Sequence, residues 1–120
     1  MTAPIVLDRG SQVLAQTRPA DTSTHSAYSP PTDRAAIIDK IIIANSTGGA
    51  LNASVFVDNT GSTFSQATAI RYAYSVPANG YHEVLFESGL EIPDAANIGV
   101  QSSSANGLTF TVLGRLRDAV

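Results

Sequence analysis

Short runs of alternating apolar and polar residues, separated by clusters of Gly, Asn, Asp, Ser and Pro, dominate this 120-residue sequence. In the clearest run, residues 69–76, the apolar side chains share one face: Ile70, Tyr72, Tyr74 and Val76. Successive side chains of a strand point to opposite faces, so this run predicts a half-buried strand with those four residues inward. Residues 51–57 and 108–116 repeat the pattern, the latter with Gly107 and Gly114 marking its ends.

These runs predict an all-β fold. Further strands are expected at 35–44, 81–87 and 97–102, and no crossover helix separates them. A chain of this length closes one hydrophobic core. About six short strands at this spacing favour an antiparallel β-sandwich or jelly-roll-like domain, which we expect to span residues 34–120.

Residues 1–33 are predicted to form an extended N-terminal arm. Segment 16–33 contains three prolines, few apolar residues and no sustained period, so it cannot build a core of its own. A small apolar cluster precedes it: Ile5, Val6, Leu7, Val13 and Leu14. We expect this cluster to bind a partner chain, and the alternative interpretation is a disordered terminus with a fortuitous apolar triplet.

The strand expected at 35–44 is apolar on both faces. Ile37, Ile41 and Ile43 share one face, and Ile38 and Ile42 share the opposite one. A strand of this kind lies either beneath another layer or at a contact with a second subunit. We therefore assign Ile38 and Ile42 to a subunit interface.

Composition and charge disfavour several functions. The formal net charge of −3 supplies no basic field for phosphates, so we expect no nucleic-acid partner. The apolar runs are far too short to span a membrane, and the N-terminus lacks the order of a signal peptide, so we expect neither a membrane partner nor export. The absence of cysteine excludes disulfides and thiolate chemistry.

No catalytic, cofactor or metal residues are predicted. The two histidines are His25, in the polar segment, and His82, whose neighbour Glu83 would point to the opposite face of a strand. Glu83 and Glu87 are expected to form an exposed, solvated pair. No nucleotide-binding, hydrolase or metalloprotease motif occurs.

Three tyrosines form the best candidate for a small-ligand site. Tyr72, Tyr74 and Tyr81 could stack against sugar rings. The alternation places Tyr72 and Tyr74 inward, however, so packing in the core is the favoured interpretation.

About two thirds of the chain resembles the small all-β accessory proteins of tailed-bacteriophage virions, which decorate or cement icosahedral heads. The resemblance is one of layout and is carried by the following segments: 36–45 (AIIDKIIIAN), 53–58 (ASVFVD), 76–80 (VPANG), 87–93 (ESGLEIP), 98–104 (IGVQSSS) and 108–114 (LTFTVLG). It implies a non-catalytic homotrimer on the capsid exterior, made in the cytoplasm of a host bacterium, with the major capsid protein as its partner.

Two other functions are compatible with the sequence. The chain could be a tail, neck or head-fibre component of such a virion, which its position and copy number would reveal. It could instead be a carbohydrate-binding module that uses the tyrosines. An enzyme is the least favoured alternative.

Overall fold

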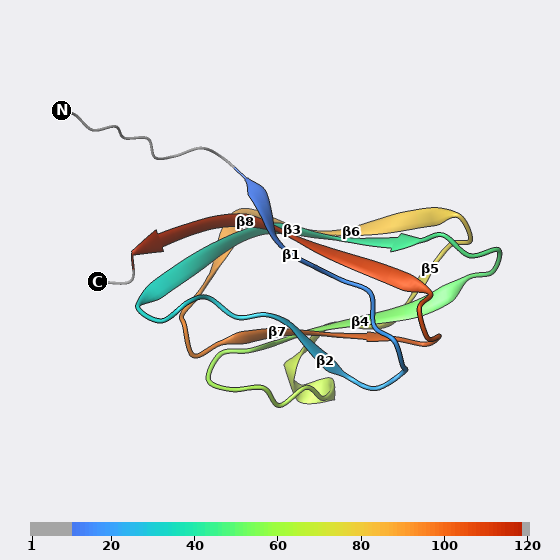
Figure 1. The fold of residues 1–120 in the computed structure, drawn as a ribbon, viewed down its shortest axis with the longest axis horizontal. Helices are drawn as coiled ribbons and strands as arrows, with labels where there is room; N and C mark the ends of the chain where they lie inside the picture. The colour runs from blue at the N-terminus through green and yellow to red at the C-terminus, as the bar shows by residue number, and fades with distance from the viewer. Residues whose placement is uncertain (1–10, 119–120) are drawn as a thin grey trace.

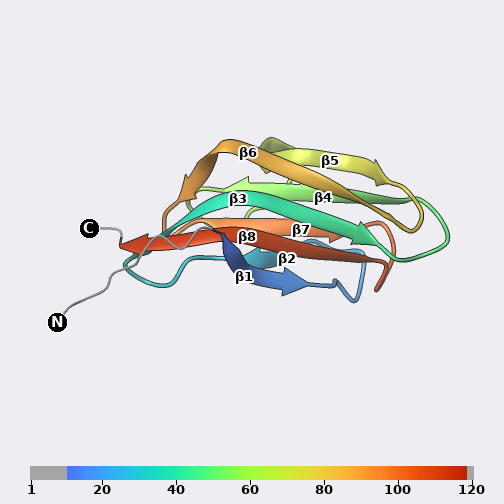
Figure 2. The same cartoon turned by 90° about the horizontal axis from the view of Figure 1, so that it is seen from above.

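The protein is a sandwich of two antiparallel four-stranded sheets, and its computed structural model describes residues 11–118 (Figure 1). The first sheet has the order β1 (Gln12–Thr17), β8 (Leu108–Asp118), β3 (Arg34–Asn45) and β6 (Gly80–Ile92). The second has the order β2 (His25–Tyr28), β7 (Asn97–Ser102), β4 (Leu51–Asp58) and β5 (Ala69–Val76). The chain changes sheet at every connection except that between β4 and β5. Figure 2 looks onto the stacked sheets from above, with β5 and β6 along one side and β1 and β2 along the other. This is the strand order of an eight-stranded jelly roll, so the predicted fold class is confirmed.

The core lies between the two sheets and consists of aliphatic side chains around one phenylalanine. Its fully buried members include Ile41, Ile43, Val55, Ile98 and Phe110. In β8 the alternation predicts the orientation correctly, because Leu108, Phe110 and Val112 are buried between the sheets. The strand nevertheless continues through Gly114 to Asp118.

A β-bulge in β3 reverses which face its side chains occupy. Ile38 pairs with Gly114 of β8 and Lys40 with Leu113, so Asp39 is an extra residue in β3. Ile38 therefore points into the core together with Ile41, and it is 0% exposed. The assignment of Ile38 to a subunit interface is thus wrong, because its own sandwich already covers it. Ile42 is partly exposed.

The predicted boundary between arm and β domain also needs correction. β1 pairs with β8, and β2 pairs with β7, so both belong to the sandwich. The connection between them is attached by the Asn106 N–H, which donates to the Pro19 carbonyl at 2.8 Å. Each strand packs only two side chains against the core, which explains why the segment looked unstructured in isolation: Leu14 and Ala15 from β1, and Ala27 and Tyr28 from β2. The β domain thus begins near residue 12.

A second bulge, in β5, turns Tyr72 outward, whereas Tyr74 pairs with the buried Ala53 and keeps the inward side at the edge beside β6. Tyr74 pairs with Ala53 and Arg71 with Val55, so Tyr72 and Ala73 together face the single residue Ser54. Ala73 adopts a left-handed backbone with φ of 50°. Tyr72 and Tyr74 are 54% and 43% exposed, so the prediction that they pack in the core is wrong.

The loop between β4 and β5 covers one end of the second sheet. Phe64 packs against the outward Phe56 at a ring distance of 5.9 Å. Asp58 holds this loop by accepting the backbone N–H groups of Thr60 and Thr63 at 3.1 and 2.8 Å. These hydrogen bonds also lower the pKa of the Asp58 carboxyl below its usual value. The rest of the outer face of this sheet is left open beside the bulge of β5.

Candidate functional site

The outer face of the first sheet carries a row of apolar side chains on neighbouring strands. Val13 pairs with Leu113, Leu113 with Lys40, and Lys40 with Leu85, so the four residues lie side by side across the sheet. Val13 is 60% exposed and Leu85 61% exposed. Ile42 lies two residues along β3 from Lys40 and therefore shares this face. We call Val13, Ile42, Leu85 and Leu113 the outer apolar patch.

The charged side chains around this patch are paired. The ammonium of Lys40 lies 3.5 Å from the Glu83 carboxylate, and Arg115 lies 3.6 Å from Asp39. Exposed pairs of this kind contribute little to stability. The charges of these two pairs cancel, so they add no net charge beside the patch.

The structure separates the residues that the sequence predicted to bind partners. Val13 and Ile42 belong to the outer apolar patch, whereas Leu14 packs against the core of its own sandwich. Ile5, Val6 and Leu7 lie outside the described residues. Leu85 and Leu113 were missed, since only the cross-strand register shows that they adjoin Val13.

Asp21, Ser23 and His25 lie together at the start of β2 but are not arranged as a catalytic triad. Ser23 Oγ donates to Asp21 Oδ1 at 2.6 Å, and His25 Nε2 lies 2.7 Å from the same oxygen. The nitrogen that contacts Asp21 is also the one nearest Ser23, at 3.4 Å, whereas a triad uses both ring nitrogens. Hydrogen bonds from the Ser23 hydroxyl, from His25 and from the Ser23 N–H lower the pKa of Asp21 to about 2. This cluster stabilises the turn.

His82 forms a small cluster with β5 at one side of the sandwich. Its ring stacks on Tyr74 at a centroid distance of 4.0 Å, and Arg71 Nε donates to its Nε2 at 3.4 Å. Partial burial, and then the charge of Arg71, lower the pKa of His82. Because Nε2 accepts a hydrogen bond here, the neutral imidazole fits this contact.

This cluster predicts a pH dependence of stability. In the unfolded chain His82 titrates near 6.5, and in the folded chain it titrates lower, so its stabilising contribution is complete above 6.5. The contribution is lost as the pH falls through 6.5 to the folded pKa. We expect the midpoint of urea unfolding to decrease more between about pH 7.5 and 5.5 in the wild type than in His82→Phe, which keeps the stacking on Tyr74. Equal pH dependence of the two proteins would contradict this assignment.

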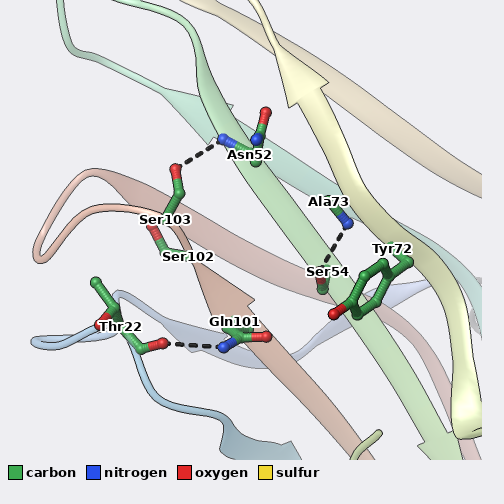
Figure 3. A pocket seen from close by; sticks show the side chains of 8 residues that line it. All are labelled: Thr22, Asn52, Ser54, Tyr72, Ala73, Gln101, Ser102 and Ser103. Carbon is green, nitrogen blue, oxygen red and sulfur yellow. Dashed lines mark hydrogen bonds between the residues drawn. The ribbon is translucent and has the colours of Figure 1, made fainter. Parts of the chain in front are cut away.

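A pocket lies on the outer face of the second sheet (Figure 3). The outer apolar patch is on the first sheet, so the two lie on opposite sides of the sandwich. It encloses about 270 Å³. Seven of its lining residues are polar and come from β4, β5, β7 and the segments next to β2 and β7: Thr22, Asn52, Ser54, Tyr72, Gln101, Ser102 and Ser103. Of the candidate tyrosines, only Tyr72 lines this pocket, because Tyr74 stacks on His82.

Metal and membrane sites were also sought in the part of the chain that the structure describes. Within residues 11–118, no three His, Asp or Glu side chains are grouped closely enough to hold a metal ion. None of the helices described there has the length and hydropathy of a membrane span.

Comparison with known proteins gives a likeness only to solved structures. No protein-family model matches the chain, and no curated protein matches it. A chain in the structure of infectious bursal disease virus strain Gx matches with 11% identity and a TM-score of 0.48, over 92% of this chain and 39% of that chain. A chain from strain Gt of the same virus matches with 14% identity and a TM-score of 0.43, over 96% of this chain and 37% of that chain. This chain thus spans about two fifths of the length of those it matches.

Proposed function

We propose that this chain is a non-catalytic structural protein of a virion, specifically a decoration or cement protein that binds the major capsid protein on the outside of the shell. The observation that carries the proposal is the outer apolar patch. Val13 and Leu85 are both more than half exposed on one face of the sheet, with Leu113 and Ile42 between them, and exposed apolar side chains gathered on one face mark an interaction site. The partner covers this face when the protein is bound.

The remaining features of the chain are compatible with this function. The jelly roll occurs in viral capsid proteins and in lectins, so the fold alone does not decide between them. The resemblance in layout to phage accessory proteins favours the virion. The low content of charged residues, 14% of the sequence, suits a lasting protein contact, since charged groups are depleted at the centre of such interfaces.

The resemblance also leads us to propose a homotrimer at a local symmetry axis of the capsid. Because Ile42 lies within the outer apolar patch, we assign it to the contact with the shell rather than to the contact between subunits. Synthesis in the cytoplasm of a host bacterium belongs to the same proposal. Many copies around a shell would combine individually modest contacts into strong retention.

Electron cryo-microscopy of virions purified from the virus that encodes this chain tests the location. The expected result is density for the sandwich on the capsid exterior, in clusters of three, with the sheet β1-β8-β3-β6 facing the shell. Density at the tail or neck would instead make the chain a component of those parts. Absence of the chain from purified particles would contradict a virion function altogether.

The patch itself is tested by Leu85→Asp. This substitution places a carboxylate within the proposed contact, and binding to the shell would remove that carboxylate from water at a cost in free energy. We expect affinity for capsids that lack the chain to fall about a hundredfold, with little change in stability because Leu85 is exposed. Ala78→Asp is the matched control, since it adds the same charge in the exposed turn between β5 and β6. Equal capsid binding by the two variants would exclude the outer apolar patch as the docking surface.

A further inference from the structure

We infer that the pocket on the outer face of the sheet β2-β7-β4-β5 binds an uncharged saccharide unit, with the ring of Tyr72 as its stacking platform. This inference does not depend on the capsid-binding surface, because the pocket and the outer apolar patch lie on opposite faces of the sandwich. A virion protein with both sites would hold the shell with one face and present the other to glycans.

The β5 bulge is the device that builds the pocket. It places both Tyr72 and Ala73 opposite Ser54, and it needs a left-handed backbone at Ala73, with φ of 50°. Alanine rarely adopts this conformation, which costs stability. The Ala73 N–H donates to Ser54 Oγ at 2.9 Å and so fixes the bulge from the floor of the pocket (Figure 3). Bulges that re-aim side chains in this way, and strained residues in general, concentrate at binding sites.

The polar groups around Tyr72 are held in place with hydrogen-bonding capacity to spare. Gln101 Nε2 donates to the Thr22 carbonyl at 3.0 Å, which orients the amide and leaves its Oε1 for a ligand. The Asn52 backbone N–H donates to Ser103 Oγ at 2.9 Å, while the Asn52 side-chain amide has no hydrogen-bond partner among residues 11–118. Ser54 Oγ accepts from Ala73 and can still donate its own proton.

This set of donors and acceptors matches sugar hydroxyls, each of which donates and accepts. An exposed aromatic ring beside amide and hydroxyl groups provides an apolar platform with a polar rim, which the two faces of a sugar ring require. No carboxylate, ammonium, guanidinium or imidazole lines the pocket. An anionic ligand such as a phosphate would find no counter-charge there, so the neutral class is favoured.

The size of the site limits the ligand. At about 270 Å³ the pocket lies just below the usual range for drug-sized ligands, which suits one sugar residue at the end of a glycan rather than a long chain. The affinity for an isolated sugar is then expected to be weak, with a Kd of about 1 mM. Repeated copies of the protein on a particle would raise the overall affinity by avidity.

The test is a nitrogen-15 NMR titration of the full chain with glucose, galactose, mannose and N-acetylglucosamine, each up to about 20 mM, a level well above the expected Kd. At least one sugar is expected to shift the side-chain amide signals of Asn52 and Gln101. Tyr72→Ala should weaken binding at least tenfold, whereas Tyr72→Phe, which keeps the ring, should retain most of it. Tyr81→Ala is the matched control, since this exposed tyrosine lies outside the pocket.

Two results would overturn the inference. The first is the absence of amide shifts with all four sugars. The second is binding that Tyr72→Ala leaves unchanged in a protein whose spectrum shows it to be folded. An extended peptide is titrated in the same way. If the peptide shifts the Asn52 and Gln101 amide signals and no sugar does, the pocket binds a peptide strand and the inference is overturned. Failure here leaves the capsid proposal intact, because the Leu85→Asp variant tests a different face.

Discussion

Replacing Ile38 with alanine is expected to lower the free energy of unfolding by about 2–5 kcal/mol, a large part of the stability of so small a domain. Ile38 is 0% exposed and packs in the core between the sheets, so truncation removes buried methyl groups and leaves a cavity. Urea unfolding followed by far-ultraviolet circular dichroism measures the change, since the chain has no tryptophan for fluorescence.

Ile42→Ala is the matched control for this experiment. Ile42 has the same side chain on the same strand, but it belongs to the outer apolar patch, so we expect its truncation to cost less than about 1 kcal/mol. Its effect should appear instead as weaker binding to capsids that lack the chain. Similar losses of stability in both variants would mean that the bulge at Asp39 does not reverse the faces of β3.

The difference between these two isoleucines illustrates where sequence alone is insufficient. Alternation placed Ile38 and Ile42 on one face, which would be correct for a strand without interruption. One extra residue at Asp39 reverses the phase, because side chains alternate with a period of two. The bulge depends on the residues of β8 and β6 opposite it, and those partners are not visible in a local pattern.

The strands that were predicted correctly are those whose pattern is not interrupted. In β8 the alternation runs unbroken from Leu108 to Val112, and the burial of its residues follows it. β5 begins with a similar pattern, but the bulge at Ala73 turns Tyr72 out of the core. The sequence therefore predicted the fold class, while it misplaced the tyrosine that now lines the pocket.

The N-terminal strands show a different kind of limit. β1 pairs with β8 and β2 with β7, and the paired residues are seventy or more positions apart in the chain. Each is an edge strand with few apolar side chains, so its stability comes from hydrogen bonds to a distant neighbour rather than from its own pattern. The same dependence on register explains why Leu85 and Leu113 were not linked to Val13.

Gly114→Ala is expected to be the most damaging small substitution in the second half of β8. A Cβ at this position would lie 2.2 Å from the Ile37 carbonyl oxygen and 3.0 Å from the Ile38 Cα. Both are backbone atoms of the β3 bulge, so no side-chain rotation can relieve the clash. We expect the free energy of unfolding to fall by about 3 kcal/mol or more, measured by urea unfolding.

The consequence of this substitution extends to the outer surface of the sheet. If β3 relieved the clash by losing its bulge, one half of the strand would slip by a residue and exchange its inward and outward side chains. The outer apolar patch would then be disrupted, so any folded Gly114→Ala protein should also bind capsids more weakly. Gly49→Ala is the matched control, because a Cβ there meets nothing within 4 Å, and its stability should stay within about 0.5 kcal/mol of the wild type. Equal stability of the two alanine variants would show that β3 and β8 do not approach each other this closely.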